Sequence, residues 1–156
     1  MRTPVRRRVL LLLSLFVGLV VQLLSAAGLT EQRPTAEINR VLKAQAQAWN
    51  RGDIDGYMQG YARAGTTQFV SGDTLTRGWD TVRDRYKAKY DTREKMGTLA
   101  FADVKVTELA ADSAMAVGRW RLKRNKDQPH GRFTLLFRRL PEGWRIVHDH
   151  TSGATN

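Results

Sequence analysis

The spacing of hydrophobic residues changes once along the chain, from a helical period to an alternating one. The helical part begins after residue 34, where positions at intervals of three and four share one face and all but Gln45 are apolar: Ile38, Val41, Leu42, Gln45, Ala46 and Trp49. This spacing predicts an amphipathic helix. Thr35 is expected to cap its start, and Gly52 can adopt the left-handed backbone that ends a helix. Asp53 is then placed to cap a second, shorter helix that includes Tyr57 and Met58.

A short strand and a third helix are predicted next. Thr66–Val70 has the composition of a strand, and Ser71-Gly72-Asp73 that of a turn. After Gly78, four large residues at helical spacing mark one face of a third helix: Trp79, Val82, Tyr86 and Tyr90.

From Gly97 onward the hydrophobic period is two, which predicts strands. Leu99 and Phe101 have one parity and Val104 and Val106 the other, so the first long strand is expected to carry a bulge near Ala102-Asp103. Three further strands are predicted, separated by short polar turns, at 113–123, 131–139 and 144–150. Helices followed by consecutive strands predict an α+β fold with an antiparallel sheet.

The N-terminus carries the pattern of an export signal. Arginines at 6–8 precede the largely apolar run Val9–Leu24, which is followed by the small residues Ser25-Ala26-Ala27. We predict a signal peptide over 1–27, a linker over 28–34 and one domain over 35–153. The alternative is an uncleaved anchor, although the run is short of the roughly 20 residues of a spanning helix. Either way the domain is expected to be periplasmic or secreted, or anchored and facing outward.

Composition narrows the classes of function. The chain has 156 residues, a formal net charge of +11 and no cysteine. The lack of cysteine excludes disulfides, thiolate metal sites and a cysteine nucleophile. Without the four arginines of the first 27 residues the net charge is +7, but no run of four basic residues follows. We therefore expect a solvated basic surface that binds no nucleic acid, and membrane contact only through an uncleaved N-terminal segment.

Two motifs resemble a known superfamily. The segment Trp49-Asn50-Arg51-Gly52-Asp53-Ile54-Asp55-Gly56-Tyr57 is similar to the start of nuclear transport factor 2-like domains. The ending Gly143-Trp144-Arg145-Ile146-Val147-His148-Asp149-His150-Thr151-Ser152-Gly153 resembles SnoaL-like proteins and the association domain of calcium/calmodulin-dependent protein kinase II. The resemblance implies three N-terminal helices packed on a curved antiparallel sheet that encloses a conical pocket, and a homodimer formed through the sheet face. It does not fix a function, because members include both enzymes and proteins without catalysis.

The resemblance also allows an enzyme to be considered. Ketosteroid isomerase-like members use a carboxylate on the first strand, which falls near Phe69–Ser71, a tyrosine near Gln45 and an acid near Arg132. All three positions differ here, so isomerase chemistry of that kind is not expected. His148 and His150 could begin a metal site, but His130 is the one other histidine in the sequence. We therefore predict no metal and no cofactor, and we leave open whether the chain is an enzyme.

A binding site is the leading prediction. Arg119 matches a position where kinase association domains carry an arginine inside the cavity, and Arg132 stands where isomerases place a pocket acid. Two buried cations would require an anion, which arginine binds bidentately. The predicted ligand is therefore a small anionic organic molecule. The predicted ligand-binding residues are Trp49, Tyr57, Trp79, Tyr86, Arg119, Arg132, His148 and His150.

Each of these residues also has a purely structural interpretation. The aromatic residues are suited to core packing, Arg119 to an ion pair, and the histidines to hydrogen bonds at the core edge. A different class of function is an oligomerising or protein-interaction module with a vestigial pocket. A third is a SnoaL-like enzyme with a histidine base, which requires His148 or His150 to face open space beside an arginine.

Overall fold

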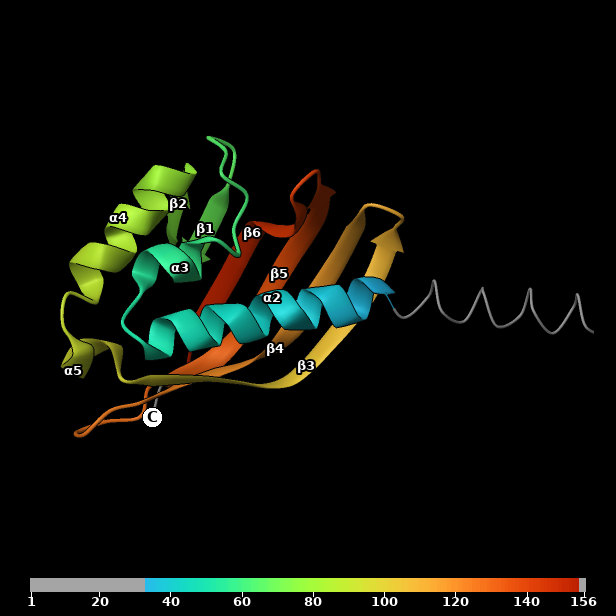
Figure 1. Ribbon diagram of the computed structural model, residues 1–156. Coiled ribbons are helices and arrows are strands. Elements are labelled where there is room, and N and C mark those ends of the chain that lie inside the picture. The colour runs from blue at the N-terminus through green and yellow to red at the C-terminus, as the bar shows by residue number, and fades with distance from the viewer. Residues whose placement is uncertain (1–32, 155–156) are drawn as a thin grey trace, which may run out of the picture. The chain divides into compact units, whose positions relative to one another are not determined.

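One curved six-stranded sheet and four helices make up the part of the chain that the structure, a computed structural model, describes: residues 33–154. In Figure 1 the helix α2 (Arg33–Asn50) lies across one face of the sheet. The predicted signal peptide and most of the predicted linker lie outside the described residues.

The first two helices follow the sequence pattern closely. α2 begins at Arg33, so Thr35 lies inside the helix and does not cap its start as predicted; the helix ends at Asn50, as predicted. Gly52 follows with a φ of 83°, which lies in the left-handed region that favours glycine. Asp53 caps α3 (Ile54–Met58), and its side chain accepts a hydrogen bond of 2.7 Å from the Gly56 N–H.

A hairpin separates the second helix from the third, in the region where the sequence predicts a short strand at Thr66–Val70 followed by a turn. It consists of β1 (Gln68–Ser71) and β2 (Thr74–Arg77), and it leads into α4 (Trp79–Lys89). A fourth short helix, α5 (Arg93–Met96), follows. The strand β2 and the helix α5 escaped prediction since three of the four residues of each are exposed, so neither carries a hydrophobic period.

The long strands form the rest of the sheet. They are β3 (Thr98–Ala110), β4 (Ser113–Lys123), β5 (His130–Leu140) and β6 (Gly143–Gly153). The strand order is β2-β1-β6-β5-β4-β3, so the last strand lies in the middle, beside the first. The sheet is not wholly antiparallel as predicted, because β1 and β6 pair in parallel. Parallel pairing of β1 and β6 is possible because a long connection, which contains β2, α4, α5, β3, β4 and β5, separates them.

The register of the long strands shifts at three places, one of them near the end of β3 between Glu108 and Ala110. In β3 the register shifts between Ala102 and Lys105, and Asp103 has a φ of 53°; this is the bulge that the sequence predicts. In β6 the register shifts opposite Leu136 and Phe137. There Ile146 pairs with Phe137 and His148 with Leu136, so Val147 is the extra residue.

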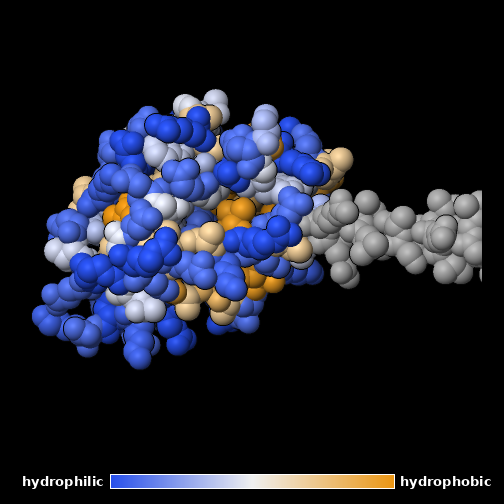
Figure 2. Space-filling view, viewed as in Figure 1, coloured by the Kyte–Doolittle hydropathy of each residue, from blue (hydrophilic) through white to orange (hydrophobic). Residues whose placement is uncertain are grey.

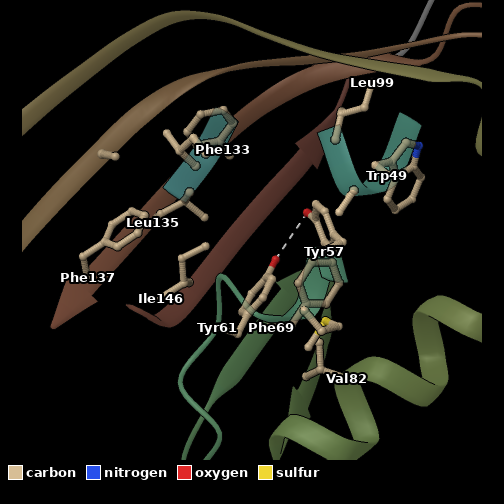
Figure 3. Packing of buried hydrophobic residues seen from close by; sticks show 14 of the residues in the cluster. Trp49, Tyr57, Tyr61, Phe69, Val82, Leu99, Phe133, Leu135, Phe137 and Ile146 are labelled. Atoms are coloured by element: carbon tan, nitrogen blue, oxygen red, sulfur yellow. Dashed lines mark hydrogen bonds between the residues drawn. The ribbon is translucent and has the colours of Figure 1, made fainter. Parts of the chain in front are cut away.

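The core fills the space between the sheet and the helices. Figure 3 shows Phe133, Leu135 and Phe137 of β5 on the same side of the sheet as Ile146 of β6. Gly118 makes room for this packing, since a Cβ there would meet the Phe133 ring at 2.5 Å. Hydrophilic residues cover most of the face that Figure 2 shows, and hydrophobic residues appear there in small patches. Among the described residues, no helix is long and apolar enough to cross a membrane.

Candidate ligand-binding cavity

A cavity of about 200 Å³ remains between the sheet and the helices. Its walls come from α2, α3, β1, α4 and the four long strands. Most of the lining is apolar or aromatic, and the lining residues include Trp49, Tyr57, Tyr61, Phe69, Arg85, Tyr86, Lys89, Tyr90, Phe133, Ile146, Asp149 and Thr151. A mostly apolar cavity with a few converging polar groups is the usual form of a site for a small organic molecule.

An aromatic cluster forms the helix side of this cavity. The Trp49 ring contacts the Tyr57 ring edge-on, with centroids 5.2 Å apart, and lies 4.7 Å from the Tyr90 ring. Tyr86 packs against Tyr57 at 5.3 Å and against Phe69 at 5.5 Å. Edge-to-face pairs of this kind hold one another in fixed orientations, so these rings form a preorganised wall.

A carboxylate and three tyrosine hydroxyls form the polar centre of the cavity. The Tyr61 hydroxyl donates a hydrogen bond of 2.6 Å to Asp149 Oδ2, and the Thr151 hydroxyl donates one of 2.7 Å to Asp149 Oδ1. The hydroxyls of Tyr57 and Tyr86 each lie 3.5 Å from that of Tyr61, as Figure 3 shows for Tyr57. These two long contacts are weak, so Tyr57 and Tyr86 retain hydrogen-bonding capacity for a ligand.

Burial sets the protonation of this centre. Asp149 is only 3 % exposed, and its removal from water raises the pKa of its carboxyl to about 6, against the opposing effect of the Tyr61 and Thr151 hydrogen bonds. Burial and the nearby Asp149 charge raise the pKa of Tyr61 well above its usual value. The tyrosines are therefore neutral donors at neutral pH, whereas Asp149 can exchange a proton close to physiological pH.

The bulge in β6 explains why Asp149 and Tyr61 meet. Ile146, next to the bulge, pairs with Phe137 on one side. On its other side its N–H donates to the Gly60 carbonyl at 2.9 Å, and its carbonyl accepts from the Ala62 N–H at 2.8 Å. These bonds fix Tyr61 beside β6. Since Val147 is an extra residue, the alternation after it is reversed, and Asp149 points into the cavity.

Two cations lie at the solvent edge of the cavity, both from α4. Arg85 is half-buried, its guanidinium lies 5.1 Å from the centre of the Phe69 ring, and its Nη1 donates to the Thr76 hydroxyl at 2.7 Å. Lys89 is exposed, and its Nζ lies 5.4 Å from the centre of the Tyr90 ring. In residues 33–154, neither cation makes an ion pair within 4 Å.

The structure brings three of the sequence-predicted site residues to the cavity wall: Trp49, Tyr57 and Tyr86. Trp79 is buried elsewhere, where its indole N–H donates to the Met58 carbonyl at 3.0 Å. The guanidiniums of Arg63 and Arg83 lie about 5 Å from its ring. Trp79 therefore joins α4 to α3 and does not line the cavity.

The two predicted arginines lie on the opposite face of the sheet. Arg119 and Arg132 are cross-strand partners, and both are exposed. The next residues in each strand, Gly118 and Phe133, are buried on the core side. Because side chains alternate between the two faces of a strand, β4 and β5 direct the two arginines outward. Arg119 contacts Asp103 at 3.1 Å, which is the ion pair considered as its structural interpretation. The cations that do line the cavity are those of α4.

The two predicted histidines also lie outside the cavity. His148 is half-buried and its Nδ1 is 3.0 Å from Gln68 Oε1, while His150 is exposed. The sequence places both on the face of Trp144 and Ile146, and the bulge at Val147 reverses that assignment. The condition set for a histidine base, open space beside an arginine within the cavity, is thus not met by either residue.

Asp149, Tyr61 and Arg85 escaped the sequence analysis. The signal for Asp149 is the adjacent apolar pair Ile146-Val147, which is compatible with a bulge but does not require one. Tyr61 lies in the connection after α3, where no periodicity applies. Arg85 is on α4 one residue before Tyr86, so the helical pattern alone gives no reason to select it. Across residues 33–154, no three histidine or acidic side chains come together as a candidate metal site.

Comparisons with known proteins agree with this architecture. The SnoaL-like domain family matches residues 38–156. An NTF-2-like protein of unknown function from Shewanella oneidensis is 43% identical, with a TM-score of 0.73, and the match covers 76% of this chain and 98% of that one. No curated protein gives a significant match.

More distant structures share the fold. A ketosteroid isomerase-like protein from Erwinia carotovora atroseptica is 20% identical, with a TM-score of 0.62 and coverage of 78% of this chain and 96% of that one. A nuclear transport factor 2-like superfamily protein from Salmonella enterica is 22% identical, with a TM-score of 0.65 and coverage of 81% and 94%. The sheet, the cavity and these matches lead to one conclusion: the chain belongs to the SnoaL-like family, with the nuclear transport factor 2-like fold.

Proposed function

We propose that this protein binds a small amphipathic organic molecule in the cavity, with an oxygen atom at the tyrosine–aspartate centre and an anionic group at the solvent edge. The observation that carries the proposal is the hydrogen bond between Tyr61 and Asp149 in a mostly apolar cavity. A buried carboxylate is costly, and here the cost is incurred next to open space that a ligand can enter.

The hydroxyls define what the polar end of the ligand can be. The Tyr61 hydroxyl donates its hydrogen bond to Asp149. The hydroxyls of Tyr57 and Tyr86 are therefore the ones that can donate a hydrogen bond to a ligand in the cavity. Both line the cavity, and either can donate to a carbonyl, ether or hydroxyl oxygen. A ligand hydroxyl can in turn donate to Asp149. An oxygen-bearing ring or chain therefore fits this centre.

The anionic part of the ligand, which the sequence led us to expect at Arg119, is instead assigned to Arg85 and Lys89. Both cations line the cavity, and Arg85 has its guanidinium fixed by Thr76 and the Phe69 ring. A charge-assisted hydrogen bond contributes roughly 1.5–3 kcal/mol. A carboxylate at this edge leaves the body of the molecule among the aromatic side chains.

A thermal-shift screen with defined probes tests the proposal. Indole-3-acetate and cinnamate are compared with their neutral amides, using the intact protein. We expect the acids to raise the unfolding temperature more than the amides do, because only the acids pair with Arg85 and Lys89. Arg85→Gln is expected to weaken binding of the acids at least tenfold, which matches the lower end of the hydrogen-bond range above.

Matched controls separate the two ends of the site. Lys87→Gln removes a cation from the same helix, but Lys87 pairs with Asp55 and does not line the cavity, so it should leave binding unchanged. Tyr61→Phe is compared with Tyr90→Phe, which alters a lining tyrosine outside the hydrogen-bonded group. No response to any probe, or equal responses in Arg85→Gln and Lys87→Gln, would count against the proposal.

The raised pKa of Asp149 supports a second candidate function, acid–base catalysis on the bound molecule. A group whose pKa lies near the working pH is suited to accept and return a proton. Incubation in heavy water with small ketones, followed by proton NMR, measures carbon–hydrogen exchange directly. Exchange that Asp149→Asn abolishes would establish this function, and ligand binding without exchange would restrict the protein to binding.

Export and assembly are further proposals that derive from the sequence. We propose that residues 1–27 direct the chain across the cytoplasmic membrane, which N-terminal sequencing of protein recovered from the periplasm would test. The homodimer, and the oligomerising role implied by the resemblance to the kinase association domain, require an assembly that survives dilution in analytical ultracentrifugation. The open cavity gives the vestigial-pocket alternative no support.

A further inference from the structure

Gln45 is a polar residue in the middle of the apolar face of α2, and the proposed function does not use it. The residue is 2 % exposed, yet it lines the cavity. Its neighbours on the same face of the helix, Leu42 and Trp49, are buried and apolar. Burying an amide is costly unless its polar atoms find hydrogen-bond partners, so core packing alone does not explain a glutamine at this position.

Two contacts fix the orientation of the Gln45 amide. Its Nε2 donates a hydrogen bond of 3.0 Å to the Tyr57 carbonyl, and because a carbonyl oxygen can only accept, the nitrogen lies on that side. The amide also lies directly against Gly60, where a Cβ would meet Nε2 at 2.5 Å. The Oε1 atom is therefore held in one place and does not exchange positions with the nitrogen.

The Oε1 atom of Gln45 is an unpaired acceptor that opens to the cavity. It accepts no hydrogen bond from residues 33–154, where Nε2 makes the hydrogen bond of this side chain. The unpaired side-chain atoms that are fully enclosed in this part of the chain are Arg124 Nε and Trp144 Nε1. Oε1 is not one of them, so a group in the cavity can reach it. An amide oxygen has two lone pairs, and both remain for a ligand.

We propose that Gln45 selects ligands whose oxygen- or nitrogen-bearing end carries a hydroxyl or N–H group, which donates to Oε1. This assignment rests on the proposed function and names its ligand class: a hydroxylated carboxylic acid, with the carboxylate at Arg85 and Lys89 and the hydroxyl at Gln45. A ligand that offers only an acceptor there would cut Oε1 off from water without giving it a hydrogen bond. Leaving a buried acceptor unpaired in this way weakens binding.

The two ends of such a ligand lie on different walls of the cavity. Gln45 belongs to α2 and the two cations to α4. The helix α3 lies between them (Figure 1), bonded to α2 through the Tyr57 carbonyl and to α4 through the Met58 carbonyl. A ligand that reaches from one end to the other therefore passes the rings of Tyr57 and Tyr86, which line the cavity. An aromatic spacer between the carboxylate and the hydroxyl fits this path.

Asp149 is a competing acceptor in the same cavity, and it is less available than Gln45. Its Oδ2 accepts a hydrogen bond from the Tyr61 hydroxyl and its Oδ1 one from the Thr151 hydroxyl. A ligand hydroxyl at Asp149 would add a second bond to an oxygen that already has one, whereas at Gln45 it supplies the first. The experiment must separate these two acceptors.

Ligands that differ at one substituent test the selection. Cinnamate, para-fluorocinnamate and the ortho-, meta- and para-hydroxycinnamates are titrated into the intact protein by isothermal titration calorimetry. We expect at least one hydroxycinnamate to bind about tenfold more tightly than cinnamate, which corresponds to one buried hydrogen bond. We expect no such gain for para-fluorocinnamate, because fluorine adds bulk without a donor.

A matched pair of variants assigns the preference to Gln45. Gln45→Met has a side chain of similar length without the amide oxygen, so the ratio of hydroxycinnamate to cinnamate affinity should fall to about one. Gln47→Met makes the same substitution two residues along α2, at an exposed position that does not line the cavity, and should keep the ratio of the wild type. Circular dichroism on each variant confirms that it is folded.

The side-chain amide of Gln45 gives a second measurement in the wild type, which does not require the variant to fold. Its nitrogen-15 and hydrogen signals are assigned through nuclear Overhauser contacts with Gly60. A hydrogen bond to Oε1 polarises the amide, so the preferred hydroxycinnamate should shift these signals more than cinnamate does. Equal shifts with the two ligands would contradict the assignment.

Three results of the titrations would overturn the inference. If cinnamate binds and no hydroxyl adds affinity, the proposed function stands and the selection by Gln45 does not. If the preference for a hydroxyl persists in Gln45→Met and is lost in Asp149→Asn, the acceptor is Asp149. If none of the acids binds, the proposed function fails and this inference fails with it.

Discussion

The bulges of β3 and β6 are similar irregularities, yet only the first could be read from the sequence. In β3 the residues on both sides of the bulge are apolar, Phe101 before it and Val104 after it, so the change of parity is visible. In β6 the apolar residues stop at the bulge: Ile146 and Val147 are followed by His148, Asp149 and His150. A polar sequence carries no parity signal, and a strand without the bulge fits it equally well.

The difference has a functional consequence. The β3 bulge keeps apolar side chains in the core. In β6, a strand without the bulge would direct His148 and His150 to the cavity, whereas the bulge directs Asp149 there instead. It also lets Ile146 bond to the segment that carries Tyr61. The candidate site is therefore produced by an irregularity that the sequence does not reveal.

The largest expected effect distinguishes the two apolar residues at the β6 bulge. Ile146 is 1 % exposed, so Ile146→Ala should lower the free energy of unfolding by about 2–5 kcal/mol, through lost burial and the cavity it leaves. Val147 is half-buried and faces away from the cavity, and Val147→Ala should cost less than about 1.5 kcal/mol. Urea denaturation measures both. Similar losses would indicate that the alternation is not reversed at this point.

The next effect concerns the pH dependence of stability. Folding raises the pKa of Asp149 from 3.8 to about 6, so the stability contributed by its proton is present below about pH 4 and is lost as the pH rises through 6. The difference corresponds to about 3 kcal/mol. Asp149→Asn should remove this part of the pH dependence, and so gain stability on the wild type as the pH rises to 7. Denaturation curves at pH 4 and 7 measure it, and parallel pH profiles for the two proteins would contradict it.

A smaller effect is expected at the β3 bulge. Asp103 has a φ of 53°, which a β-branched residue adopts at a cost of roughly 1–2 kcal/mol. Asp103→Val should be destabilising by about that amount, whereas Asp103→Asn, which tolerates this backbone, should change stability by less than about 0.5 kcal/mol. Thermal denaturation compares them. Equal behaviour would argue against a left-handed residue in the bulge.

The smallest effect is expected at the histidines. His148 makes one hydrogen bond, to Gln68, so His148→Ala should cost about 0.5–1.5 kcal/mol of stability. His150→Ala should change stability less, because His150 is exposed. Neither variant should alter binding of indole-3-acetate or cinnamate, which the thermal-shift assay reports. A loss of probe binding in either variant would return the histidines to the site.

Much of the fold is predictable from the sequence because the residues that face the core recur at the period of their helix or strand. The end of α2, the boundaries of β4, the Asp53 cap and the β3 bulge all follow from such patterns. The α4 aromatic Tyr86 and the α2 residue Trp49 line the cavity since the cavity is an extension of the core. The resemblance alone suggests Arg119 and Arg132 as cavity residues, whereas the alternation of their strands directs both side chains outward.

What could not be predicted depends on contacts between distant parts of the chain. The parallel pairing of β1 with β6 joins residues some 80 positions apart, and Tyr61 meets Asp149 across 88. Neither contact has a local signature. The cations Arg85 and Lys89 gain significance only from the cavity beside them, which no pattern in α4 describes.

The most direct test of the account is the titration of the Asp149 carboxyl, followed by carbon-13 NMR and assigned with Asp149→Asn. Burial in the cavity predicts a pKa of about 6. The Tyr61 hydrogen bond stabilises the ionised form, so Tyr61→Phe should raise the pKa of Asp149 further, while Tyr90→Phe should leave it unchanged. A pKa near 4 in the wild type, or one that Tyr61→Phe does not move, would contradict the placement of Asp149 at the centre of the site.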